Sequence, residues 1–167
     1  IDHLPDNIFV SPGTKAPNRE GFSKYASYIN SITEQKYGRP LILAMSADLS
    51  DSTNISGFAK GYGGARDKGF YEKKSNTKSP LFPQGITEFT NAGMMAGAAT
   101  VNFSAKPYES FSGFYGAVST YGSFSYLKYG PLRLFSQLAQ DSELKVGKII
   151  WAVSYTHLTL PTTHGVE

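Results

Sequence analysis

Apolar residues recur in the first part of the chain with helical spacing and then form a short uninterrupted run. Within residues 19–36 the apolar positions of one helical face are Phe22, Tyr25, Ala26, Ile29 and Ile32. Gly38 and Pro40 end this predicted helix. The run over residues 41–45 is typical of a strand that is covered on both faces, as in a parallel sheet.

The second half of the chain again alternates between helical and strand patterns. The pattern predicts a helix over residues 88–102, a further helix after residue 130 and a second buried strand over residues 148–153. The apolar positions of the further helix are Leu132, Leu134, Phe135 and Leu138. This order of elements predicts an α/β fold, a mostly parallel sheet flanked by helices.

Two segments between these elements lack a clear period. Residues 47–84 are rich in Gly, Ser, Lys and Asp, and we expect a long loop of functional importance there. Residues 107–130 form an aromatic, glycine-rich stretch. The predicted organisation is an irregular lead-in (1–18), one α/β domain (19–153) and a tail (154–167).

The composition excludes several classes of protein but does not indicate an activity. The chain has 167 residues, no cysteine and a net charge of +3, which indicates one globular domain without disulfides or thiolate chemistry. So small a charge does not favour a nucleic-acid partner, and no apolar run is long enough to predict a membrane partner. The absence of cysteine fits a reducing compartment, and we expect a cytoplasmic protein.

Both ends of the sequence raise a question about its native extent. The first residue is Ile1 and the earliest methionine is Met45, inside a predicted core strand, so we expect a fragment of a longer protein. Residues 153–162 resemble the translation of an adapter used to prepare DNA for sequencing. We therefore expect an artefact there, the alternative being a genuine Thr- and Leu-rich loop.

Glu88 precedes a run of small and apolar residues, from Phe89 to Ala99, that carries no charge. The macrodipole of a helix favours an ionised carboxylate at its start, whereas burial raises the pKa of a carboxyl group. When the helix macrodipole and burial oppose each other in this way, a glutamate can share a proton with a ligand nitrogen. The structural alternative, an ordinary glutamate of a first helical turn, is favoured by position alone.

Two further segments carry candidate site residues. Asp48 follows the strand over residues 41–45. Ligands of α/β proteins bind beyond the carboxyl ends of strands, so Asp48 is a candidate site residue. The alternative is a turn or a helix cap, which Asp and Ser also form at such positions. Tyr121, Phe124 and Leu127 are spaced three apart, as on one face of a helix. That face either packs into the core or forms a wall on which a flat heterocycle stacks.

Four motifs in one order carry a resemblance to a known family. Residues 46–50 read SADLS, residues 85–89 GITEF, residues 106–108 KPY and residues 148–153 KIIWAV. Over roughly residues 19–153 the chain resembles the pyrimidine-binding domain of transketolases, which are thiamine-diphosphate enzymes. The resemblance implies the fold of that domain and the transfer of a two-carbon ketol unit from a ketose phosphate to an aldose phosphate.

The resemblance also implies a role for each candidate residue. Glu88 corresponds to the catalytic glutamate that exchanges a proton with the aminopyrimidine ring of the cofactor. Asp48 corresponds to an aspartate near the cofactor at the subunit contact, and Tyr121, Phe124 and Leu127 to the aromatic pocket, although the family more often has an aromatic at the position of Leu127. Ser52 and Arg19 correspond to residues that bind the sugar phosphate, with a longer spacing between Arg19 and Asp48 than the family shows.

The remaining implications concern groups outside this chain. In the family the cofactor's diphosphate and a Mg²⁺ or Ca²⁺ ion are bound through a Gly-Asp-Gly motif and an asparagine in another domain, which a homodimer partner supplies. That motif is absent here, so we expect the isolated chain to be inactive. Two alternatives stay open: a related thiamine-diphosphate enzyme, such as a pyruvate dehydrogenase subunit or a deoxyxylulose phosphate synthase, and a non-enzymatic basic α/β binding module.

Overall fold

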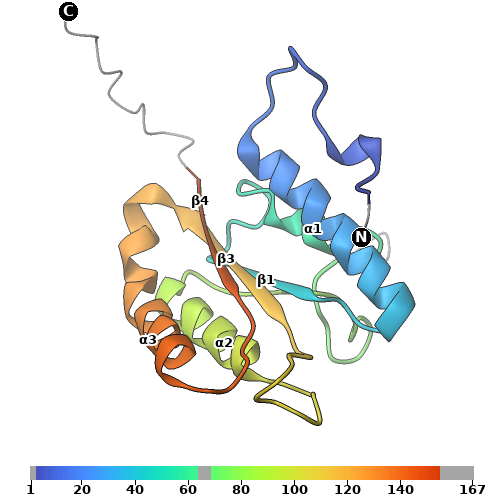
Figure 1. The fold of residues 1–167 in the computed structure, drawn as a ribbon. Coiled ribbons are helices and arrows are strands. Elements are labelled where there is room, and N and C mark those ends of the chain that lie inside the picture. Colours follow the sequence, from blue (N-terminus) through green and yellow to red (C-terminus); the bar gives the residue numbers. More distant parts are fainter. Residues whose placement is uncertain (1–2, 64–68, 155–167) are drawn as a thin grey trace, which may run out of the picture.

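The computed structural model describes residues 3–63 and 69–154, which form a four-stranded sheet with helices on both faces (Figure 1). The strands are β1 (Ile42–Ser46), β2 (Leu81–Phe82), β3 (Tyr115–Tyr121) and β4 (Ile149–Ser154). Their order across the sheet is β2-β1-β3-β4, and all neighbours are parallel. The predicted α/β fold with a parallel sheet is confirmed, while the pyrimidine-domain type stays a prediction.

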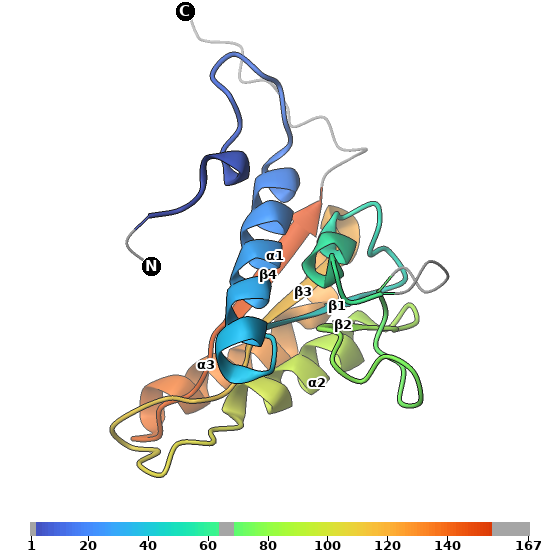
Figure 2. The ribbon, with the colours of Figure 1, turned by 90° about the vertical axis from the view of Figure 1, so that its right-hand side faces the viewer.

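The helices divide between the two faces of this sheet, as Figures 1 and 2 show. One face carries α1 (Asn18–Tyr37) and the short 3₁₀ helix η2 (Ile55–Ala59). The other face carries α2 (Glu88–Thr100) and α3 (Tyr129–Asp141). Two more 3₁₀ helices are η1 (Asp6–Ile8) and η3 (Gly122–Lys128). Within the described ranges, no helix has the length and apolar character needed to cross a membrane.

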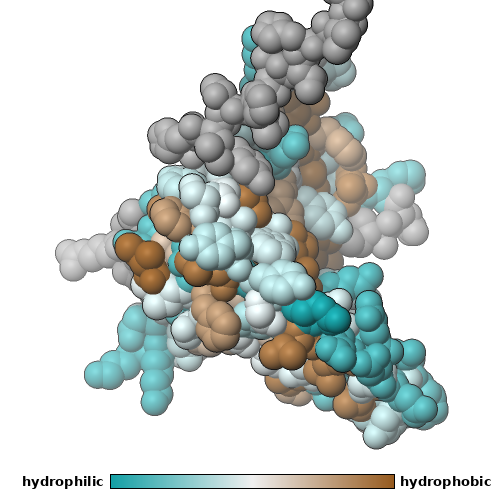
Figure 3. Space-filling view, turned by 90° about the vertical axis from the view of Figure 1, so that its left-hand side faces the viewer, coloured by the Kyte–Doolittle hydropathy of each residue, from teal (hydrophilic) through white to brown (hydrophobic). Residues whose placement is uncertain are grey.

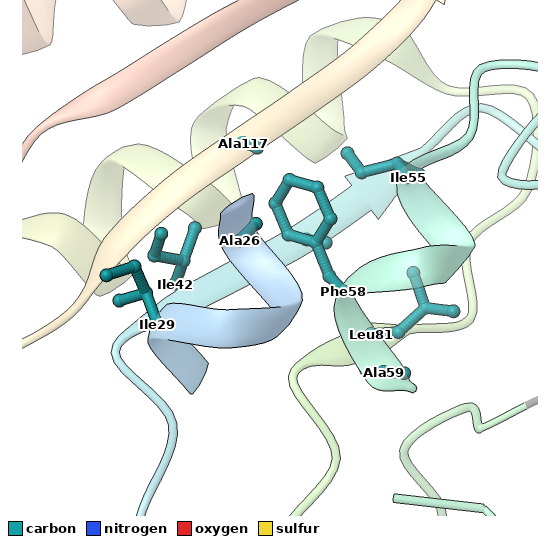
Figure 4. Packing of buried hydrophobic residues seen from close by; sticks show 9 residues of the cluster. Ala26, Ile29, Ile42, Ile55, Phe58, Ala59, Leu81 and Ala117 are labelled. Carbon is teal, nitrogen blue, oxygen red and sulfur yellow. The ribbon is translucent and has the colours of Figure 1, made fainter. Parts of the chain in front are cut away.

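Alternation along β1 produces a hydrophobic core on each face of the sheet. Ile42 and Ala44 point toward α1 and η2, and Figure 4 shows that cluster around Phe58. Leu43 and Met45 point the other way, toward α2. Every residue of β1 is buried, so the prediction of a strand covered on both faces is confirmed.

Asn30 fastens α1 to the sheet and to η2. Its side chain is fully buried, and its amide nitrogen donates to the carbonyl oxygens of Ile42 at 2.9 Å and Phe58 at 3.3 Å. Its amide oxygen accepts from the backbone nitrogens of Leu41 and Ile42 at 3.1 and 2.8 Å. A buried amide with four such bonds fixes the start of β1 relative to α1.

The central strand β3 lies in the stretch that showed no strand pattern. Small residues such as Gly116 and Ala117 interrupt its apolar run, which is why the sequence did not reveal it. The helical spacing predicted from Tyr121 was wrong, because Tyr121 ends β3 and only Gly122 begins η3. The segment 47–84 is likewise not one long loop, since it contains η2 and the two-residue strand β2.

The last strand, β4, was predicted to be covered on both faces, and this was wrong. It is an edge strand that pairs only with β3 in the described part of the chain, and Ile150 and Trp151 are each 39% exposed. An apolar run does not distinguish a central strand from an edge strand. Ser154 ends β4, and the remainder of the tail, including His157 and His164, lies outside the described residues.

Two glycines on facing elements offer a matched stability test. A Cβ on Gly116 of β3 would overlap the Met95 side chain of α2, so we expect Gly116→Ala to lower the free energy of unfolding by about 1–3 kcal/mol. A Cβ on Gly97 of α2 would meet no atom within 4 Å. Gly97→Ala should therefore raise stability by up to about 1 kcal/mol. Urea denaturation of both variants measures the difference, and equal effects would contradict this packing of α2.

Candidate active site at the carboxyl ends of β1 and β3

The candidate residues gather where the chain leaves β1 and β3 in opposite directions (Figure 1). After β1 the chain continues to η2, on the face of α1. After β3 it continues through η3 to α3, on the face of α2. Such a topological switch point forms a crevice at the carboxyl ends of two neighbouring parallel strands, where ligands of α/β proteins bind.

Glu88 is the first residue of α2 and is only 5% exposed. Thr120, near the end of β3, donates its hydroxyl hydrogen to Glu88 Oε1 at 2.9 Å. A carboxylate accepts several hydrogen bonds, so Glu88 could accept from a ligand N–H group in addition to Thr120. The helix N-terminus also stabilises its negative charge.

Asp48 lies two residues beyond β1, at the exposed carboxyl edge of the sheet. Its backbone adopts the left-handed conformation with φ 58°, and its nitrogen donates to the Ser46 carbonyl oxygen at 2.8 Å. Asp tolerates this conformation better than most residues do. The left-handed backbone conformation therefore explains why an aspartate is tolerated in this turn. Its side chain is exposed at this edge of the sheet.

Ser52 and Tyr121, predicted from two different motifs, contact one another. The Tyr121 hydroxyl donates to Ser52 Oγ at 2.8 Å. Beneath this contact, the hydroxyls of Thr53 and Ser119 share a hydrogen bond at 2.9 Å. These bonds join the turn after β1 to β3, so the structure brings together the candidate residues of both segments.

Arg19 lies at the same edge of the sheet, at the start of α1. Its Nη1 donates to Ser154 Oγ, at the end of β4, at 3.1 Å. Arg19, Thr53 and Ser154 are among the residues that line a small cavity of about 170 Å³. Because Thr53 adjoins Ser52, the two predicted phosphate ligands lie on one side of the crevice, although they do not contact each other directly.

Phe124 and Leu127 both belong to η3 and are 48% and 38% exposed. A 3₁₀ helix has three residues per turn, so the two side chains share one side of it. Their interpretation as core residues is therefore wrong. They join a set that we call the exposed aromatic surface: Ile86, Phe89, Phe124, Tyr126, Leu127 and Tyr129. Figure 3 views this side of the molecule, where apolar and weakly polar side chains gather.

Lys128, the last residue of η3, is a site feature that the sequence analysis missed. Its side chain is 1% exposed, and Nζ donates to the carbonyl oxygens of Val118 at 2.9 Å and Ala152 at 3.3 Å. Burial lowers the pKa of Lys128 to about 7, and the nearby Glu88 carboxylate opposes that shift. One feature of the sequence could have indicated its role: Lys128 is the sole charged residue between Glu109 and Arg133.

The described residues contain no cluster of three His, Asp or Glu side chains that would hold a metal ion. Hydroxyl, carboxylate, aromatic, ammonium and guanidinium groups lie in this region of the sheet. Comparisons with protein-family models, with curated proteins and with solved structures give no match to this chain.

Proposed function

We propose that this chain is the pyrimidine-binding part of a transketolase-type enzyme, which transfers a two-carbon ketol unit between sugar phosphates with thiamine diphosphate. The observation that carries the proposal is the buried Glu88 carboxylate at the start of α2, held on Thr120 at the switch point of a parallel sheet. A buried carboxylate is costly unless hydrogen-bond donors compensate it. A ligand N–H group would add a second donor to the one that Thr120 supplies.

The carboxylate of Glu88 and the aromatic groups at this edge of the sheet would suit an aminopyrimidine ring. Glu88 Oε2 would hold the proton that passes to or from a ring nitrogen, while Thr120 keeps Oε1 in place. Tyr121 and Phe124 stand at the same edge and would supply aromatic surface to the ring. When bound, thiamine diphosphate supplies the carbon nucleophile of the transfer, and the protein supplies orientation and electrostatics.

Two groups on the α1 side of the crevice suit a phosphorylated substrate. Arg19 offers a guanidinium, which binds phosphate with charge-assisted hydrogen bonds. Ser52 offers a hydroxyl, which Tyr121 orients. These two residues favour a sugar phosphate over the acyl acceptor of a pyruvate dehydrogenase. Asp48 lies between Arg19 and Ser52 in the sequence and is exposed just beyond the carboxyl end of β1.

The other half of the proposed site lies outside this chain. The exposed aromatic surface includes Ile86 and Phe89, which are 77% and 63% exposed and flank Glu88. Apolar side chains grouped in this way on a surface mark an interaction site. We propose that a homodimer partner covers this surface and supplies the groups for the diphosphate and its Mg²⁺ or Ca²⁺ ion.

An activity assay of the full-length protein tests this proposal. We expect a two-carbon unit to pass from xylulose 5-phosphate to ribose 5-phosphate only when thiamine diphosphate and Mg²⁺ are present. Unphosphorylated xylulose and ribose serve as the control substrates and should react poorly. Decarboxylation of pyruvate in place of ketol transfer would assign the chain to one of the related thiamine-diphosphate enzymes. The absence of any cofactor-dependent turnover would overturn the proposal.

A further inference from the structure

A second cavity lies at the end of the sheet opposite to the candidate active site. It has a volume of about 300 Å³ and is lined by the end of α1, the residue before β1 and the segment that leads into β3. We call it the Arg39 cavity, after the charged residue in its lining. Tyr115, also in the lining, is the first residue of β3, and the seven residues of this strand span roughly 20 Å. The Arg39 cavity is therefore remote from the crevice at the other end of β3 (Figure 1).

The guanidinium of Arg39 is held in place by the segment that leads into β3. Its Nη1 donates to the carbonyl oxygen of the buried Gly113 at 2.9 Å. Its central carbon lies 4.8 Å from the centre of the Phe114 ring and 5.4 Å from that of Phe103. Arginine has five N–H donors, so the bond to Gly113 leaves others that can bind a ligand. A donor group that is already positioned binds a ligand at a smaller entropic cost.

The lining of the Arg39 cavity contains no carboxylate. Within the described ranges Arg39 forms no ion pair. The acidic residues closest in sequence to the lining segments are paired elsewhere. Glu34 of α1 pairs with Lys78 at 2.9 Å, and Glu109 pairs with Lys106 at 3.0 Å. The positive charge of Arg39 is therefore available to an anion.

The carboxyl end of α1 opposes an anion at this place, but only in part. The macrodipole of a helix is equivalent to about half a negative charge at its carboxyl end. Arg39 carries a full positive charge, and Lys36 adds a second, 5.2 Å from the centre of the Tyr37 ring, which lines the cavity. The two cations together outweigh the helix dipole, so the local charge favours an anionic ligand.

We propose that the Arg39 cavity binds the phosphate group of a small phosphorylated molecule. A guanidinium binds phosphate through paired, charge-assisted hydrogen bonds. Tyr37, Ser112 and Tyr115 add hydroxyl groups to the lining, which suit the several oxygens of a phosphate better than the two of a carboxylate. The inference does not rest on the proposed function, because no lining residue is a candidate residue of the crevice.

The cavity has room for more than the phosphate itself. Its volume is at the lower limit of typical small-molecule pockets. Phe111 also lines it and stacks on Tyr115, with ring centres 5.7 Å apart and planes 17° apart. This pair of rings offers an apolar wall to the organic part of a phosphate ester.

Titration of the full chain, followed by the backbone amide NMR shifts of Ser112 and Gly113, tests the inference. The probes are inorganic phosphate, phenyl phosphate and, as a carboxylate of similar shape, benzoate. We expect phenyl phosphate to bind most tightly and benzoate at least about tenfold more weakly. Arg39→Lys keeps the charge but loses the paired donors, so it should lower the affinity for phenyl phosphate at least about tenfold. Arg133→Met, which removes an exposed arginine of α3, is the matched control and should leave the affinity unchanged.

A second variant keeps the test decisive if Arg39→Lys does not fold. Tyr37→Phe combined with Ser112→Ala removes two hydroxyls at exposed positions and should lower the affinity about fivefold or more. Unchanged affinity in either folded variant would overturn the inference, as would equal affinity for benzoate. Equal affinity for inorganic phosphate would contradict a site for an ester. Shifts confined to Arg19 and Ser52 would show that phosphate binds in the crevice alone, which would overturn the inference and leave the proposed function standing.

Discussion

On the proposed function, we expect Glu88→Gln to lower the kcat for ketol transfer by the full-length protein at least ~100-fold at saturating thiamine diphosphate, because it would remove a general acid–base group. Glutamine has the same shape, and its amide oxygen still accepts the hydrogen bond from Thr120. It does not take up or release a proton at neutral pH. The substitution thus removes proton exchange and leaves the packing at the start of α2 intact.

Steady-state kinetics separate this loss from a loss of binding. A group that acts on a proton in the transition state changes kcat, while the KM for the sugar phosphates should change little. Glu109→Gln is the control, because Glu109 is exposed and pairs with Lys106 at 3.0 Å, away from the crevice. Near-normal turnover by a folded Glu88→Gln enzyme would show that Glu88 does not exchange the proton.

The sequence predicted those parts of the site that depend on local order along the chain. In a parallel sheet, a residue just after a strand and a residue at the start of a helix come to the same edge. Asp48 and Glu88 occupy such positions, so their placement followed from the strand and helix patterns alone. Burial of Glu88 was expected from the charge-free run that follows it, although α2 leaves Phe89 and Met94 63% and 45% exposed.

The sequence did not reveal contacts that depend on pairing between distant strands. β3 is the centre of the sheet, yet its small residues give no strand pattern until β1 and β4 lie beside it. The burial of the Lys128 side chain could not be predicted from the sequence for the same reason. Its partners lie 10 and 24 residues away, on two strands, and only these two strands side by side create the place where an ammonium is held.

The free energy of unfolding should rise with pH between about 7 and 10, because Lys128 is buried. The pKa of Lys128 is lowered from 10.5 to about 7 in the folded chain. Between these values the unfolded chain binds a proton that the folded chain does not, so stability increases by up to about 1.4 kcal/mol per pH unit. Below pH 7 both states bind the proton, and the cost of burying the ammonium is then fully present.

Urea denaturation at several pH values within this window measures the slope, and Lys128→Met should remove most of it. The exposed Lys36 lies at the end of α1, on the opposite face, and Lys36→Met should keep the wild-type slope. The window ends near pH 10 for two reasons. The unfolded chain releases the Lys128 proton near 10.5. In addition, burial and the Glu34 carboxylate raise the pKa of Tyr62 to about 12, so Tyr62 lowers stability above pH 10. Equal slopes in wild type and Lys128→Met would mean that the ammonium of Lys128 is solvated in the folded chain.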